Sequence, residues 1–148
     1  MSVKEARDKV HMKKYLNISL IYAIAAMAGG VFYREFTKFN SFTGTTVLGK
    51  VHGHLFLLGM TVFLLVALFS AHCDFEKQKT FHTFILVYNI GLPLTSVMFF
   101  VRGIVQVLGI ELSKGADASI SGIAGIGHIL LGVGIVLLLL SLKKLAKD

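Results

Sequence analysis

Cysteine and charge are both scarce in this 148-residue sequence. The one cysteine, Cys73, excludes an internal disulfide and a CxxC metal or redox pair. Charged residues make up 16% of the chain, against about 25% in an ordinary soluble domain. The sequence also has no phosphate-binding loop, no paired catalytic carboxylates and no Ser–His–Asp constellation. Nucleotide hydrolysis and serine-type hydrolysis therefore have no motif to support them.

Long apolar blocks dominate what remains. Hydrophobic residues make up 55% of the chain, and its mean hydropathy is +0.75. Blocks of about 18 or more apolar residues are typical of membrane-spanning helices. We therefore predict an all-α integral membrane protein, an up-down four-helix bundle that forms one domain over residues 1–148. The predicted spans are about 16–36, 47–71, 82–108 and 120–142.

The distribution of cations predicts how these spans are oriented. The N-terminal segment is too long and too charged for a cleaved signal peptide, so the first span is expected to be retained. Because Lys and Arg collect in cytoplasmic segments, the chain is expected in the cell membrane with both termini in the cytoplasm. Spans two and four would then run inward from the outer face. We interpret the net charge of +7 as a determinant of membrane orientation and not as a sign of nucleic-acid binding. The cytoplasmic cations are Lys4, Arg7, Lys9, Lys13, Lys14, Lys77, Lys79, Lys143, Lys144 and Lys147, against Arg34, Lys38, Lys50 and Lys114 outside.

Three ionisable side chains lie deep inside the predicted spans. At about 1.5 Å per residue, His54 is roughly 10 Å into span two and His128 roughly 12 Å into span four. Arg102 is about six residues from the outer end of span three, so it approaches the same level from the other direction. Such groups are costly in a bilayer, face the bundle interior and mark functional sites. The matched depth predicts one shared site.

Span two offers two candidate ligands, His52 and His54. They are about 200° apart around a helix, so one of them is expected to face the site and the other a neighbour or solvent. Depth matching favours His54, with His52 as the alternative, because Gly59 follows His52 by seven residues and lies on the same face as His52.

Glycines also flank His128, at Gly125 and Gly132. A histidine between residues without side chains leaves a flat recess, which suits a haem macrocycle with the imidazole on its iron. Arg102 would then pair with a propionate. Close helix packing is the alternative explanation for the glycines.

A second cluster of potential metal ligands lies in the predicted cytoplasmic loop. It has one thiol and no regular ligand spacing, so an ordinary polar loop is favoured over a zinc site. Its members are His72, Cys73, Asp74, Glu76 and His82.

Two stretches carry a family resemblance. "KVHGHLFLLGM" and "GIGHILLGVG" resemble a family of small four-span bacterial membrane proteins with His-x-His early in the second span and one His in the fourth. The resemblance supplies no activity. The same glycine-flanked histidines are more distantly similar to the haem-ligating helices of haem–copper oxidase subunit I. The additional histidines of a binuclear centre are missing here, so full oxidase chemistry is not expected.

The leading hypothesis is a membrane protein that binds haem b through His54 (or His52) and His128, for electron transfer or for gas binding and sensing. Its partners would be the lipid bilayer and a redox partner or a second copy. One alternative is a small transporter or channel component that binds an ion, proton or anion at the His–Arg cluster. Another is a non-catalytic accessory or assembly subunit. The sequence does not decide whether the chain is an enzyme.

Overall fold

The computed structural model describes residues 3–71, 74 and 77–145, and the described residues with regular structure are all helical. Helices α1 (Val3–Phe39), α4 (Lys79–Leu108) and α5 (Lys114–Leu145) are long and continuous. The remaining long helix is composite. It begins with the 3-10 turn η1 (Val47–Gly49), continues as α2 (Lys50–His54), passes through the π-helical segment η2 (Leu55–Thr61) and ends as α3 (Val62–Ser70).

Four stretches of the described chain are long and apolar enough to cross a membrane, as expected for a multi-pass membrane protein. They are Lys9–Phe39, Val47–Ser70, Lys79–Leu108 and Lys114–Leu145. Three of the helices are longer than the predicted spans, since α1 starts at Val3, α4 at Lys79 and α5 at Lys114, whereas the second runs from Val47 to Ser70, close to the predicted 47–71. The apolar residues predict only the part of a helix that can lie in lipid. A helix can extend beyond that part into polar residues that also adopt helical backbone angles.

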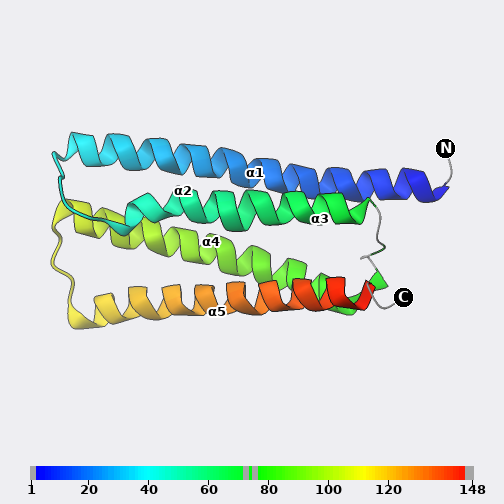
Figure 1. Ribbon diagram of the computed structural model, residues 1–148. Helices are drawn as coiled ribbons and strands as arrows, with labels where there is room; N and C mark the ends of the chain where they lie inside the picture. The colour runs from blue at the N-terminus through cyan, green and yellow to red at the C-terminus, as the bar shows by residue number, and fades with distance from the viewer. Residues whose placement is uncertain (1–2, 72–73, 75–76, 146–148) are drawn as a thin grey trace.

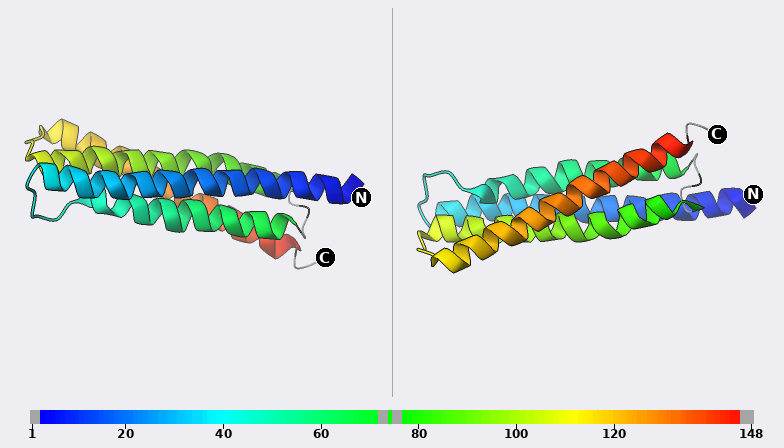
Figure 2. Two further views of the ribbon diagram at one scale, coloured as in Figure 1. Left: turned by 90° about the horizontal axis from the view of Figure 1, so that it is seen from above. Right: turned by 90° about the horizontal axis from the view of Figure 1, so that it is seen from below.

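The helices run up and down, with the start of α1 and the end of α5 at the same end of the bundle (Figure 1). Helix α1 packs along α2, η2 and α3, and α5 packs mainly on α4. Helix α5 also crosses the others at a visible slant (Figure 2). Its beginning stands apart from α4, and the two helices converge toward the end that holds the termini (Figure 1), where α5 also approaches α3 (Figure 2).

Aromatic rings fill the half of the bundle nearest the termini. Phe63 of α3 stacks on Tyr22 of α1 with ring centroids 5.6 Å apart, and it meets Tyr88 of α4 edge-on at 6.0 Å. Phe84 continues the cluster 5.2 Å from Tyr88. All four rings are buried. Rings of this size bury large areas and prefer stacked or edge-on contacts, so they fix α1, α3 and α4 against one another.

The π-helical segment η2 is supported by hydroxyl groups. Widening the turn leaves backbone carbonyls badly placed for helical bonds, and lipid supplies no donor. Tyr88 donates its hydroxyl to the carbonyl of Leu58 at 2.8 Å, and Ser19 donates to that of Met60 at 2.8 Å. Thr61 donates to the carbonyl of Phe56 at 3.0 Å. Side chains of α1, α4 and η2 itself thus satisfy the irregular segment that follows His54.

Glycine allows the second long helix and α4 to touch at the end of the bundle opposite the termini. A Cβ at Gly103 would lie 2.7 Å from the backbone nitrogen of Leu48 and 2.8 Å from its Cα, and backbone atoms in η1 cannot move aside cheaply. Thr46 donates its hydroxyl to the Gly103 carbonyl at 3.2 Å. This contact sets where the second span begins relative to α4.

We predict that Gly103→Ala lowers stability by about 1–3 kcal/mol, the usual cost of overpacking. Gly122→Ala is the matched control, because no atom lies within 4 Å of a Cβ at Gly122. It should be neutral or slightly stabilising through its better helix propensity. Thermal unfolding in detergent, followed by circular dichroism, measures both. Equal unfolding temperatures for the two variants would contradict the role given to Gly103.

Candidate functional site: a histidine pair between two helices

Two histidines from different spans face each other in the bundle. His54 is the last residue of α2, and His128 lies on α5. Their ring centroids are 6.3 Å apart, and the ring planes are nearly perpendicular at 84°. The structure therefore brings together the two residues matched by depth, although 74 positions separate them in the chain.

Both rings are oriented by their own helices. Nδ1 of His54 is 3.0 Å from the carbonyl oxygen of Lys50, and Nδ1 of His128 is 2.8 Å from that of Ala124. A carbonyl only accepts, so each Nδ1 carries the proton and donates it. In a neutral ring, Nε2 then keeps its lone pair, at the far end of the ring. This is the arrangement by which a backbone carbonyl fixes a metal-binding histidine.

Phe99 of α4 forms the third side of the pair. Its ring centroid is 4.7 Å from that of His54 and 5.7 Å from that of His128, both edge-on. The sequence analysis did not select Phe99, because a phenylalanine in an apolar span is unremarkable by type. Spacing was the available signal, since Phe99 follows Thr95 by four residues and precedes Arg102 by three.

The α5 side of the site is open. His128 is exposed and His54 is half-buried. A Cβ added at Gly125 or at Gly132 would meet no atom within 4 Å. These two glycines therefore do not serve close packing within the chain, and they leave space on both sides of His128 along α5.

His52 lies on the other side of its helix. A Cβ at Gly30 of α1 would come within 3.6 Å of His52 Cβ, which places the side chain against α1. Its Nδ1 is buried and has no hydrogen-bond partner in the part of the chain that the structure describes. The structure thus turns His54, and not His52, toward His128.

Gly59 is also placed away from the histidine pair. A Cβ there would lie 2.6 Å from Tyr22 Cγ and 2.7 Å from its Cβ, so the glycine admits the Tyr22 side chain of α1. The sequence analysis expected Gly59 to lie beside a macrocycle. Gly59 instead faces α1 and allows the two helices to pack closely.

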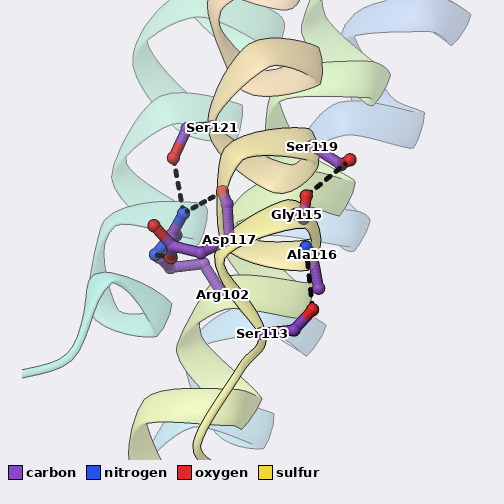
Figure 3. A network of polar contacts seen from close by, with 7 residues as sticks. All are labelled: Arg102, Ser113, Gly115, Ala116, Asp117, Ser119 and Ser121. Atoms are coloured by element: carbon purple, nitrogen blue, oxygen red, sulfur yellow. Dashed lines mark hydrogen bonds and ion pairs between the residues drawn. The ribbon is translucent and has the colours of Figure 1, made fainter.

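Arg102 connects α4 to the first turns of α5 (Figure 3). Its Nη1 is 2.6 Å from Asp117 Oδ1, and its Nη2 donates to the Asp117 carbonyl at 3.2 Å and to Ser121 Oγ at 2.7 Å. Ser121 precedes His128 by seven residues, which is about 10 Å along a helix. Arg102 therefore lies nearer the end of the bundle than the histidines, and its guanidinium already has a carboxylate. A propionate would have to share it.

The chemistry open to this site is that of two imidazoles in a mostly apolar environment. Within residues 3–71, 74 and 77–145, no three His, Cys, Asp or Glu side chains come together as a metal site. Of the loop cluster for which an ordinary polar loop was favoured over a zinc site, His72, Cys73 and Glu76 lie outside the described residues. Two imidazoles alone leave a zinc ion two protein ligands short. They complete the coordination of a haem iron, whose other four ligands come from the macrocycle.

The fold and the site define a class: a protein of four long apolar helices that carries a pair of facing histidines between its second and last helices. The chain belongs to the family described as "Protein of unknown function (DUF2871)", whose sequence profile matches residues 12–145. This agrees with the resemblance to a small family of such proteins, while the likeness to haem–copper oxidase stays a prediction. No curated protein and no solved structure matched the chain.

The contact of Arg102 with Asp117 can be measured as a coupling energy. We predict that Arg102→Gln and Asp117→Asn each destabilise the protein, and that their effects in the double variant differ from additivity by about 1 kcal/mol. The reason is that either single change removes the same charge-assisted bond. Thermal unfolding in detergent of the wild type, the two single variants and the double variant measures this coupling as a double-mutant cycle. Full additivity would show that the pair does not hold α4 and α5 together.

Proposed function

We propose that this protein binds a b-type haem between α2 and α5, with His54 and His128 as the two axial ligands. The observation that carries the proposal is the facing pair of rings, 6.3 Å between centroids, with both Nδ1 atoms engaged by carbonyls of their own helices. Ionisable side chains inside membrane spans are costly and are usually kept for a function. Two such histidines at this separation therefore support a shared ligand.

The ring separation agrees with a shared metal. Metal–imidazole nitrogen distances are about 2.0–2.1 Å, and each nitrogen is about 1.1 Å from its ring centre, so two axial rings have centroids roughly 6 Å apart. The nearly perpendicular ring planes are compatible with this, because two imidazoles that held one iron would not need to be coplanar. His52 does not compete, since it lies against Gly30 on the other side of the helix.

The surrounding residues have defined tasks in this proposal. The carbonyls of Lys50 and Ala124 hold the protons on Nδ1, which keeps Nε2 free as a donor to metal. Gly125 and Gly132 leave room for the edge of a macrocycle beside His128. The Phe99 ring, 4.7 and 5.7 Å from the two imidazole centroids, lies beside the midpoint between them and would have to turn aside to admit a macrocycle. When bound, such a group supplies reversible one-electron chemistry. Two protein ligands leave no open axial position, so electron transfer is the activity that we favour over gas binding.

The orientation is proposed from charge. Nine of the fifteen Lys and Arg residues belong to the start of α1, to the start of α4 or the position Lys77 before it, and to the last turn of α5, which share one end of the bundle. The positive-inside tendency then directs this end to the cytoplasm in the cell membrane. The histidine pair would lie in the outer half of the bilayer. An electron would accordingly be exchanged with a partner at the outer face.

Transport remains the main alternative function, and the accessory role the second. A transport site for anions would need a free cationic group, whereas Arg102 is engaged with Asp117 and Ser121. Both alternatives predict that the purified protein has no haem absorption bands.

The purified protein should show a Soret band and sharp reduced-minus-oxidised bands typical of two histidine ligands. We predict that His54→Ala and His128→Ala each abolish or strongly shift these bands, because each removes one axial nitrogen. His52→Ala is the matched control, two positions from His54 on the same helix, and should retain them. Ultraviolet–visible spectra after haem supplementation measure all four proteins. The proposal fails if the wild type shows no Soret band, or if His52→Ala behaves like His54→Ala.

Carbon monoxide separates electron transfer from gas binding. With both histidines as ligands, the spectrum of the reduced wild type should be unchanged by carbon monoxide. His128→Ala should gain a carbon monoxide difference spectrum, because one axial position becomes free. A clear response of the wild type would favour the gas-binding alternative.

A further inference from the structure

The second long helix changes its register within η2. On the core side, its buried residues recur at four-residue steps from α2 into α3, at Val51, Leu55, Gly59 and Phe63. In an α-helix of about 3.6 residues per turn, residues spaced by four drift around the axis by about 40° at each step. Three such steps add up to about 120°, which would carry Val51 away from the face of Phe63. The π-helical turn removes this drift, because it holds one extra residue.

The extra residue decides where the two histidines point. His54 precedes Phe63 by nine residues, which is about 900° in an uninterrupted α-helix and places it on the side opposite the core. His52 precedes Phe63 by eleven residues, about 1,100°, and would lie almost in line with it. The π-turn rotates α2 by one residue step, about 100°, relative to that arrangement. Val51 then enters the core, and the two histidines lie on its two flanks.

The observed contacts match this rotation. Val51 is fully buried. His54 faces His128 of α5 with ring centroids 6.3 Å apart. His52 lies against α1, since a Cβ at Gly30 would come within 3.6 Å of the His52 Cβ. With an uninterrupted α-helix in place of η2, His54 would turn away from the bundle and His52 would enter the core.

Two hydroxyl groups from other helices stabilise the π-turn. Tyr88 of α4 donates to the carbonyl of Leu58 at 2.8 Å, and Ser19 of α1 donates to that of Met60 at 2.8 Å. A widened turn leaves its carbonyls poorly placed for helical bonds, and lipid supplies no donor. The Tyr88 ring is fully buried, and a Cβ at Gly134 of α5 would lie 2.6 Å from its Cδ2. The packing of this ring therefore holds its hydroxyl at η2.

We infer that Tyr88, assisted by Ser19, is a positioning residue: its hydroxyl stabilises the π-turn, and the π-turn directs His54 rather than His52 toward His128. Loss of the hydroxyl should allow η2 to relax to an α-helix, which rotates α2 by about 100°. The rotation requires no ligand, whereas its consequence for ligation rests on the proposed haem.

A disulfide measures the rotation independently of haem. Gly30→Cys with His52→Cys places two Cβ atoms about 3.6 Å apart, inside the usual disulfide range of about 3.5–4.5 Å. Cys73→Ser removes the one native cysteine. We expect this disulfide to form readily under mild oxidation. Tyr88→Phe should slow its formation several-fold, because rotation of α2 carries position 52 away from α1, and Ser19→Ala should slow it further.

Tyr22→Phe is the matched control for the loss of a hydroxyl. Tyr22 is buried in the same aromatic cluster as Tyr88, but its hydroxyl donates to Asn89 Oδ1 at 3.0 Å and not to η2. The rate of disulfide formation should therefore stay at the value of the parent protein.

Deletion of Leu57 separates the π-turn from a general effect on stability. Leu57 is an exposed residue of η2, and its removal takes out the extra residue. His54 then precedes Phe63 by eight residues, about 800°, so a continuous α-helix gives it the direction that the π-turn gives it now. The deletion should keep the disulfide, and Tyr88→Phe in this background should no longer slow it.

Carbon monoxide tests the consequence for ligation. In the haem-loaded protein, reduced Tyr88→Phe should gain a carbon monoxide difference spectrum, because His54 no longer reaches the iron. Tyr22→Phe should remain without one.

Four results would overturn the positioning role. The first is an unchanged rate of disulfide formation in Tyr88→Phe, and the second is an equal loss in Tyr22→Phe. The third is a sensitivity to Tyr88→Phe that persists after deletion of Leu57, when no π-turn is left to stabilise. The fourth is a slowed disulfide in a haem-loaded Tyr88→Phe protein that still ignores carbon monoxide. A wild type without a Soret band would remove the haem proposal alone, and the disulfide rates would still decide whether Tyr88 sets the rotation of α2.

Discussion

The apolar surroundings of the four spans impose one constraint on which the rest of the structure depends: each polar group inside them has to find its partner within the protein. Tyr88 and Ser19 meet it by donating to the carbonyls of η2. His54 and His128 meet it with one ring nitrogen each, bonded to the preceding turn. The hydrogen bonds of Nδ1 leave Nε2 of each histidine without such a partner on its own helix, and the two rings face each other with centroids 6.3 Å apart.

The two ends of the bundle are built differently. Near the termini, stacked aromatic rings centred on Phe63 and Tyr88 fix α1, α3 and α4. Toward the other end, glycines admit neighbouring atoms at Gly59 and Gly103, and a pair of charged side chains, Arg102 and Asp117, holds α4 to α5. A rigid aromatic half and a half with open glycine faces provide a scaffold that positions ligands without filling their site.

Much of the fold could be predicted from residue type and spacing. The four apolar blocks predicted four long helices, and depth counting paired His54 with His128. The contributions of Gly59, Phe99 and Asp117 could not be predicted, because each depends on which helix faces which. Gly59 has the spacing of a site residue and packs on Tyr22. Phe99 has the type of a packing residue and lies 4.7 Å from His54.

The sequence by itself determined the number of spans, the excess of cations at one end and the opposite directions of His52 and His54, since all three follow from composition and from the angle per residue of a helix. Only the tertiary structure decided that His54, and not His52, faces His128, that Arg102 is engaged by Asp117, and that the end of α5 approaches α3. Helical periodicity fixes angles within one helix. The rotation and tilt of one helix against another depend on contacts between residues far apart in the chain, such as Gly103 with Leu48 and Phe63 with Tyr22.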